Sequence, residues 1–235
     1  MTSSIIRATT HSSPSNTVAA KVAAAVSEIR SGNPVVLVDS RSPGKEGDLV
    51  FAGAMATPKL MAFAIRHSSG FLCVALPEAV CDALRLPPMY TQANDDSWHG
   101  ACCVTVDAIC GTTTGISAAD RATTTRALAD SSTQHTAFTR PGHVVPVRTR
   151  SSQLLTDFVT ADAAARLVDI AGLAPVSAFA RIVSTLDPTR MARESELHEF
   201  ARRHDLAELT VDDLVFYELT RPPDCCKPQA PKGHQ

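Results

Sequence analysis

The chain has 235 residues, of which 44% are hydrophobic and 20% are charged. This composition predicts a globular protein with a sizeable core, and it excludes an intrinsically disordered chain and a coiled coil. The formal net charge is only −2, so neither a nucleic acid nor an anionic membrane is expected as a partner. No apolar run approaches the roughly 18 residues of a membrane-spanning helix.

The seven cysteines are an odd number and lack the paired C-x-x-C spacing of a zinc site. Most lie in apolar stretches, which favours reduced thiols and therefore a cytoplasmic protein. The polar segment 1–16 lacks the apolar centre of a secretory signal and is expected to be a flexible arm. The proline-rich segment 221–235 is expected to be a disordered tail. Residues 17–220 are expected to form one domain.

The first half of the chain alternates short apolar runs with amphipathic segments. Strands are predicted at 34–40, 49–56 and 71–76, and helices at 17–30, 57–67 and 77–86. Ser15 or Asn16 can cap the first helix, and Pro58 stands in the first turn of the second, where proline is favoured.

The second half continues the alternation. Strands are predicted at 102–108, 144–147 and 176–183, and helices at 117–130, 161–172, 193–204 and 210–220. Ser117 and Asp120 form an S-x-x-D capping pattern at the start of the first of these helices. Short strands interleaved with helices predict a layered α/β domain.

Two blocks of the sequence are long and specific, GTTTGISAADRATT from residue 111 and RPGHVVP from residue 140. Together with other segments in the same order, they resemble the 3,4-dihydroxy-2-butanone 4-phosphate synthase family. The other matching segments are 46–53, 56–76, 84–89, 171–175 and 191–204. The resemblance implies a single α/β (α+β) domain with a mixed central sheet flanked by helices. It also implies a homodimer whose active sites are shared between the subunits.

Members of that family convert ribulose 5-phosphate, through an enediol, into formate and a four-carbon phosphorylated ketone. A magnesium ion organises the substrate oxygens, while carboxylates and a histidine move protons. The resemblance implies the catalytic residues Cys73, His143, Glu46 and Asp48, and the substrate-binding residues His99, Thr112 and Ser117.

The sequence departs from the family at several ligand positions. Gly44 stands where the family has a magnesium-binding glutamate, and Pro43 where it has an arginine that contacts substrate. The segment TDFVTADAA places Asp157 at the phosphate-binding arginine and Thr160 at the metal-binding histidine. An aspartate would repel a phosphate group. We therefore expect neither magnesium nor another cofactor.

The family also has a catalytic glutamate later in the chain, and this glutamate aligns near Arg181.

Three functions are compatible with these departures from the family. The first, which the departures favour, is a repurposed enzyme that acts on a small, non-phosphorylated substrate of specialised metabolism by metal-independent acid/base chemistry. The second is an authentic synthase of riboflavin biosynthesis. The third is a non-catalytic dimer that binds a ligand or a partner.

Overall fold

The computed structural model describes residues 14–89, 102–150 and 159–220. The expected arm 1–16 lies mostly outside these residues, and the expected tail 221–235 lies entirely outside them. The same is true of His99 and Asp157. No helix among the described residues is long and apolar enough to cross a membrane.

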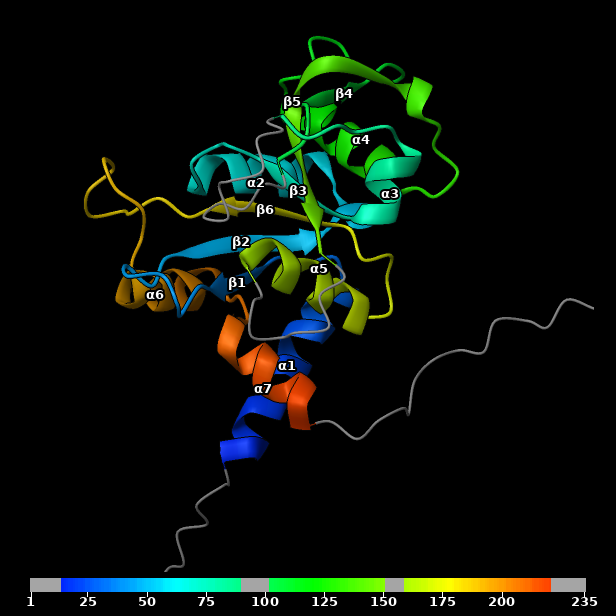
Figure 1. Cartoon of the computed structure of the whole chain (residues 1–235). Helices are drawn as coiled ribbons and strands as arrows, with labels where there is room; N and C mark the ends of the chain where they lie inside the picture. Colours follow the sequence, from blue (N-terminus) through cyan, green and yellow to red (C-terminus); the bar gives the residue numbers. More distant parts are fainter. Residues whose placement is uncertain (1–13, 90–101, 151–158, 221–235) are drawn as a thin grey trace, which may run out of the picture.

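A mixed sheet of seven strands forms the centre of the described part of the chain, in the order β4-β5-β3-β6-β2-β1-β7 (Figure 1). The strands are β1 (Val35–Val38), β2 (Gly47–Ala52), β3 (Cys73–Pro77), β4 (Val106–Ala108), β5 (Phe138–Thr149), β6 (Ser177–Arg181) and β7 (Glu208–Thr210). The pairs β3–β5 and β1–β7 are parallel, and the other pairs are antiparallel. This confirms the expected mixed sheet.

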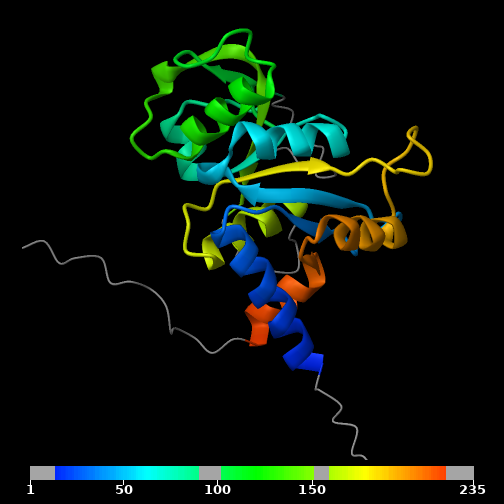
Figure 2. The ribbon, with the colours of Figure 1, turned by 180° about the vertical axis from the view of Figure 1, so that it is seen from behind.

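Helices cover both faces of the sheet (Figures 1 and 2). The helices whose side chains join the larger core are α2 (Pro58–His67), α3 (Glu78–Ala83), α4 (Ala118–Ala129) and α6 (Glu194–His204). The helices on the opposite face are α1 (Pro14–Arg30), α5 (Thr160–Ile170) and α7 (Val211–Thr220). Along β2, Leu49 and Phe51 belong to the first core, whereas Val50 and Ala52 belong to the second. This is the two-residue alternation of a strand buried on both faces.

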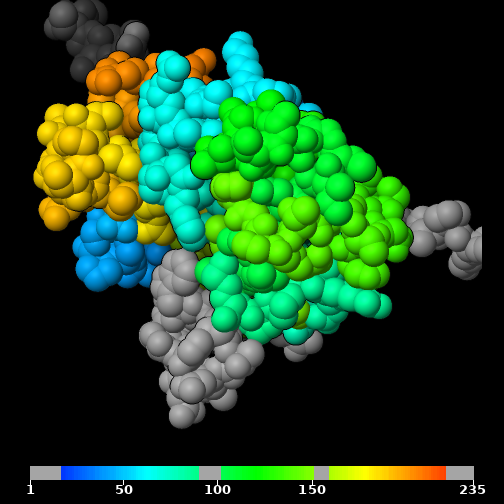
Figure 3. All heavy atoms as spheres, turned by 90° about the horizontal axis from the view of Figure 1, so that it is seen from above, coloured from blue at the N-terminus to red at the C-terminus, as the bar shows by residue number. Residues whose placement is uncertain are grey.

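The predicted starts of α2 and α4 are confirmed, but that of α1 is wrong, because the helix begins at Pro14 and Ser15 and Asn16 lie inside it. Thr57 Oγ1 accepts the Leu60 N–H at 3.1 Å at the start of α2, directly before Pro58. Ser117 Oγ accepts the Asp120 N–H at 3.0 Å and begins α4. Seen from above, the green chain of β4, α4 and β5 lies on one side of the molecule, and the yellow loop after β6 lies on the other (Figure 3).

The observed strands differ from the predicted ones at three places. β5 has 12 residues instead of the four at 144–147, because its first half pairs only with β4 and carries polar, exposed side chains that hide the pattern. Of the predicted strand 102–108, only Val106–Ala108 forms a strand, while Cys102 and Cys103 make isolated bridges. β7 was not predicted, since three residues are too short to show a period.

Candidate active site

Cys73 lies at the start of β3, between the two strands that carry His143 and Arg181. Its register partners are Val145 of β5 and Phe179 of β6. His143 precedes Val145 by two residues, and Arg181 follows Phe179 by two. Side chains two residues apart along a strand point to the same face of the sheet. The register therefore places Cys73, His143 and Arg181 on one face, which α5 covers with its alanines beside Cys73.

Arg181 forms the centre of an ion-pair cluster with Glu46 and Asp48. Its Nη1 lies 2.6 Å from Glu46 Oε2, while Nε lies 3.2 Å from Asp48 Oδ1 and Nη2 lies 3.1 Å from Asp48 Oδ2. Asp48 and Arg181 are direct register partners on β2 and β6. Asp48 is 2% exposed, and this burial raises the pKa of its carboxyl, an effect that the Arg181 charge opposes.

His143 forms a pair with Asp107, the central residue of β4. Its Nδ1 lies 2.6 Å from Asp107 Oδ2, and its backbone N–H donates to Asp107 Oδ1 at 2.9 Å. The His143 side chain is 41% exposed, whereas that of Asp107 is 10% exposed. With Nδ1–H donating a hydrogen bond to the carboxylate, the lone pair of the neutral imidazole lies on Nε2. A histidine held in this way can act as a general base.

The turn 112–117 packs against this pair. Gly115 has φ +86°, and a Cβ there would lie 2.0 Å from Asp107 Oδ2 and 2.8 Å from His143 Nδ1, so only glycine fits. Thr112 uses its hydroxyl to donate to the Ala108 carbonyl, and Ser117 caps α4. The two predicted substrate-binding hydroxyls therefore shape the turn beside His143.

Cys73 is a buried thiol. Burial raises its pKa to about 12, and the Cys102 and Asp48 side chains act in the same direction. The Arg181 charge lowers the pKa, but its effect is the smallest of these. Cys73 is therefore protonated at neutral pH, so it can donate a weak hydrogen bond but offers no thiolate nucleophile.

The oxygen atoms that could hold a metal ion belong to the loop before β2 and to the start of β2 itself. Glu46 and Asp48 supply carboxylates, and Asp39 lies close by, with its N–H bonded to the Glu46 carbonyl at 2.8 Å. Gly44 adds no side chain, and the Thr160 hydroxyl donates to Asp39 Oδ2 at 3.4 Å. Among the described residues, no group of three histidine, cysteine or acidic side chains is arranged around a metal position.

These residues do not fit a magnesium ion in the arrangement seen here. Magnesium needs carboxylate oxygens at about 2.0–2.1 Å, and the Arg181 guanidinium already lies against both carboxylates. Asp48 Oδ2 is buried and accepts no hydrogen bond, since Arg181 Nη2 lies near it without aiming an N–H at it. One oxygen of the cluster thus remains incompletely satisfied.

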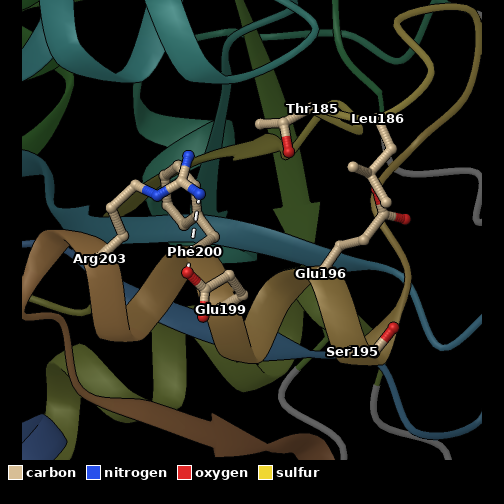
Figure 4. Close-up of a pocket in the computed structure, with 7 residues that line it drawn as sticks. All are labelled: Thr185, Leu186, Ser195, Glu196, Glu199, Phe200 and Arg203. Atoms are coloured by element: carbon tan, nitrogen blue, oxygen red, sulfur yellow. Dashed lines mark ion pairs between the residues drawn. The ribbon is translucent and has the colours of Figure 1, made fainter.

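A separate hollow of about 190 Å³ lies between α6 and the segment that follows β6 (Figure 4). Thr185 and Leu186 border it on one side, and Phe200 and Arg203 border it on the other. Figure 4 shows Arg203 paired with Glu199, at 3.6 Å. None of the described residues that the sequence analysis assigned to the site lines this hollow.

The family model for 3,4-dihydroxy-2-butanone 4-phosphate synthase matches residues 23–217. The chain belongs to the 3,4-dihydroxy-2-butanone 4-phosphate synthase family. It is 48% identical over 191 residues to the riboflavin biosynthesis protein RibBA of Mycobacterium avium, covering 81% of this chain and 45% of that protein. With the RibBA of Nocardia farcinica it shares 48% identity over 193 residues, or 82% and 46% of the two chains. The chain thus spans about half the length of these synthase-family relatives.

Solved structures of synthases have the same fold. A 3,4-dihydroxy-2-butanone 4-phosphate synthase in complex with two magnesium ions superposes with a TM-score of 0.77 and 36% identity, covering 83% of this chain and 95% of that chain. RibBX of A. baumannii, a two-domain synthase, gives a TM-score of 0.79 and 33% identity, covering 86% and 59% of the two chains.

The comparisons correct the expected function. The departures at Gly44, Asp157 and Thr160 favoured a repurposed enzyme with a non-phosphorylated substrate, but 48% identity to riboflavin biosynthesis proteins supports the authentic synthase instead. The expectation weighed a few ligand positions more heavily than the similarity of the whole domain. It also took no account of side chains that approach the site from other strands.

The expectation of no cofactor is contradicted as well. A 3,4-dihydroxy-2-butanone 4-phosphate synthase 36% identical to this chain was solved in complex with two magnesium ions. The expectation rested on the replacements at Gly44 and Thr160 and gave little weight to Glu46 and Asp48, whose carboxylates remain in this region.

Sequence reasoning missed Asp107 and the part that Arg181 plays. The available signal for Asp107 was an acidic residue in the otherwise apolar run VTVDA. The pairing of Arg181 with Asp48 could not be predicted, because it depends on the register of β2 with β6.

Proposed function

We propose that this chain converts ribulose 5-phosphate into formate and 3,4-dihydroxy-2-butanone 4-phosphate, the four-carbon unit of riboflavin. The observation that carries the proposal is the Asp107–His143 pair, at 2.6 Å, in a chain 48% identical to riboflavin biosynthesis proteins. The pair supplies an oriented base, which is the first requirement of enediol chemistry.

In the proposed reaction, His143 Nε2 accepts a proton from the carbon beside the substrate carbonyl. The C–H bond breaks, and its electron pair forms the enediolate. The Asp107 carboxylate holds the Nδ1 proton throughout, so the ring keeps one orientation. After the rearrangement, the same nitrogen returns the proton. A five-carbon ketose phosphate has the atoms of formate plus the four-carbon ketone phosphate, so no water and no redox partner is needed.

The negative charge of an enediolate requires positive charge or hydrogen-bond donors nearby. Two groups on the same face of the sheet as His143 can contribute. Arg181 carries a permanent positive charge, and Cys73 retains its thiol proton. We propose that Glu46 and Asp48 hold Arg181 in place on this face, with ion-pair contacts of 2.6 and 3.1 Å.

We further propose a cytoplasmic homodimer whose active sites are shared between the subunits. The cysteine usage supports the compartment, and the resemblance to the family supports the dimer. Sedimentation at micromolar concentration tests the oligomeric state, and a monomer would contradict the shared site.

Formate release tests the proposed function directly. The purified chain is incubated with ribulose 5-phosphate and magnesium, beside His143→Asn and the control His198→Asn. His198 is an exposed histidine with its own carboxylate partner, Glu208, at 3.2 Å. His198→Asn therefore removes a histidine from the same kind of pair, but outside the proposed site. We expect activity in the unmodified chain and in the control, and at least about a 100-fold loss in His143→Asn. Equal background rates in all three would favour the non-catalytic relative.

A further inference from the structure

Two helices outside the candidate active site meet through a pair of histidines. His67 is the last residue of α2, and His204 is the last residue of α6. The centres of the two imidazole rings lie 4.8 Å apart. Phe63 has its ring centre 4.7 Å from that of His67 and 5.2 Å from that of His204. Phe200 lies 5.6 and 4.5 Å from the same two rings. These four residues, which we call the ring tetrad, join the end of α2 to the end of α6.

The tetrad can accommodate one positive charge, but a second is opposed. An imidazolium within about 6 Å of an aromatic ring is attracted to its face, and the C-terminal end of a helix also favours a cation. Two imidazolium ions with their centres 4.8 Å apart repel each other in a partly buried place. Burial lowers the pKa of His67, and the charges of His204 and Arg66 act in the same direction. The fold therefore favours a neutral His67.

The charged groups around the tetrad do not compensate a second proton. Among the described residues, no carboxylate forms an ion pair with His67 or His204. The charged neighbours on the elements that pack against the two helices are Arg66 of α2, Arg203 and the exposed Asp205 at the end of α6, Glu199, which pairs with Arg203, and Arg121 of α4, which donates to the Gly70 carbonyl. β1, which packs against α6, contributes only valine and leucine.

The end of α2 is tied to the central sheet by backbone hydrogen bonds. Just beyond this helix, the Ser69 N–H donates to the Arg181 carbonyl of β6 at 2.8 Å. The Val183 N–H donates to the His67 carbonyl itself at 3.4 Å. Repulsion between the two histidines should therefore displace α6 and leave α2 in place.

α6 rests on the sheet directly behind the loop of the candidate active site. Leu197 lies so close to Gly47 that a Cβ at that glycine would be 2.7 Å from Leu197 Cδ1. Gly47 stands between Glu46 and Asp48, the two carboxylates that hold Arg181. A movement of α6 away from the sheet would thus remove the side chain that supports this loop.

We propose that the ring tetrad is an acid-sensitive clasp, which holds the end of α6 against α2 until both histidines are protonated and then releases it. Release withdraws Leu197 from Gly47 and loosens the loop that leads to Glu46. A histidine whose pKa is lowered on folding stabilises the fold above its ordinary value of 6.5, and this contribution is lost as the pH falls below it. The clasp is therefore closed at neutral pH and weakens in mild acid.

Amide hydrogen exchange of the full chain, followed by mass spectrometry, tests the clasp without any turnover. Protection is compared at about pH 7.5 and about pH 5.5, after correction for the intrinsic exchange rate at each pH. We expect the protection of α6 to fall at least about tenfold in acid. The loop should lose protection with it, including the Asp39 amide that donates to the Glu46 carbonyl at 2.8 Å. Unchanged protection of α6, or a loss in α6 that leaves the loop unchanged, would overturn the proposal.

His204→Phe keeps an aromatic ring in the tetrad but cannot take a proton, so its α6 should be equally protected at both pH values. His198→Phe is the matched control, because it makes the same change on the same helix. His198 is exposed and pairs with Glu208 at 3.2 Å, outside the tetrad. This control should keep the full loss of protection in acid. A loss that persists in His204→Phe, or disappears in His198→Phe, would place the sensitive group elsewhere and reject the clasp.

A titration of the unmodified chain covers the case in which His204→Phe fails to fold. The ring protons of His67 and His204 are followed by nuclear magnetic resonance as the pH is lowered. Because the two charges repel, the imidazoles should take up their protons in two separate steps, with His67 below its ordinary pKa. The Phe63 and Phe200 ring signals should change in the second step, when the tetrad opens. A single common step, with unchanged phenylalanine signals, would refute the clasp.

Discussion

Both oxygens of Asp107 bind His143, Oδ1 through the backbone N–H at 2.9 Å and Oδ2 through Nδ1 at 2.6 Å. A single carboxylate therefore fixes the strand and the imidazole that projects from it. The backbone contact holds β5 against β4, and the ring cannot turn away without breaking the hydrogen bond between Nδ1 and Oδ2. This double attachment makes Asp107 a positioning residue for the proposed base.

Replacing Asp107 with asparagine should lower formate release by at least about 100-fold. The amide can donate to Nδ1, which moves the ring proton to Nε2 and removes the lone pair that accepts the substrate proton. The ¹⁵N shifts of the His143 ring should show the altered tautomer, while KM changes little. Asp130→Asn is the control, since the Asp130 side chain accepts hydrogen bonds from the N–H and the hydroxyl of Ser132, just beyond the end of α4. A normal tautomer with lost activity would contradict the positioning role.

Gly115→Ala should destabilise the fold by about 2–4 kcal/mol, because its Cβ would meet Asp107 at 2.0 Å and φ is +86°. Gly70→Ala separates the two causes. Gly70 has a similar φ of +73°, but no atom lies within 4 Å of its Cβ, so only the backbone cost of about 1 kcal/mol applies. Urea unfolding midpoints measure both variants. Equal losses would show that the close approach to Asp107 is unimportant.

Glu196 should make stability depend on pH in acid. Hydrogen bonds from Arg190 and Ser184 lower the pKa of its carboxyl to about 2. A depressed pKa stabilises the fold above the unfolded value of 4.5, and the contribution disappears as pH falls from 4.5 to about 2. Glu196→Gln should therefore cost about 1–2 kcal/mol at pH 7.

The cost of Glu196→Gln should vanish near pH 2. Glu194→Gln, which breaks the exposed pair with Lys45 at 2.8 Å, is the control and should cost at most about 0.5 kcal/mol. Thermal unfolding across this pH range measures both variants. A pH-independent difference for Glu196→Gln would mean that the loss comes from packing and not from ionisation.

Cys73 should resist alkylation by iodoacetamide in the folded protein at pH 8. Its thiol is buried and its pKa is raised to about 12, so almost no thiolate is present or accessible. Cys110 is exposed and provides an internal control. Mass spectrometry of the peptides should show label at Cys110 in the native protein, and at Cys73 only after unfolding. Rapid labelling of Cys73 would contradict the protonated, buried thiol.

The sequence patterns predicted the layered fold because they are local. Buried runs such as 35–38 and 73–77 alternate with capped helices, and each signal lies within a dozen residues. The parts of the site that depend on strand register could not be predicted in the same way. Nothing near Arg181 in the chain shows that Asp48 will lie opposite it, and nothing near His143 shows that Asp107 will accept its N–H.

Family resemblance supplied the remaining site residues, with mixed results. The structure brings Glu46 and Asp48 together around Arg181, and the register puts Cys73 on the same face. The Thr112 and Ser117 hydroxyls instead form local hydrogen bonds, with the Ala108 carbonyl and the Asp120 N–H respectively. A resemblance identifies positions, but the partners of each side chain depend on the neighbours in this particular chain.

The parallel pairing of β1 with β7 joins Val36 to Glu208. During synthesis from the N-terminus, β1 leaves the ribosome early, but β7 is the last of the described strands to emerge. Until then, β1 pairs only with β2 and leaves one edge of backbone N–H and C=O groups open, which invites pairing with another chain. Arg181 and His143 both precede β7 in the chain, so the strands that carry them are synthesised before the strand that covers this edge of β1.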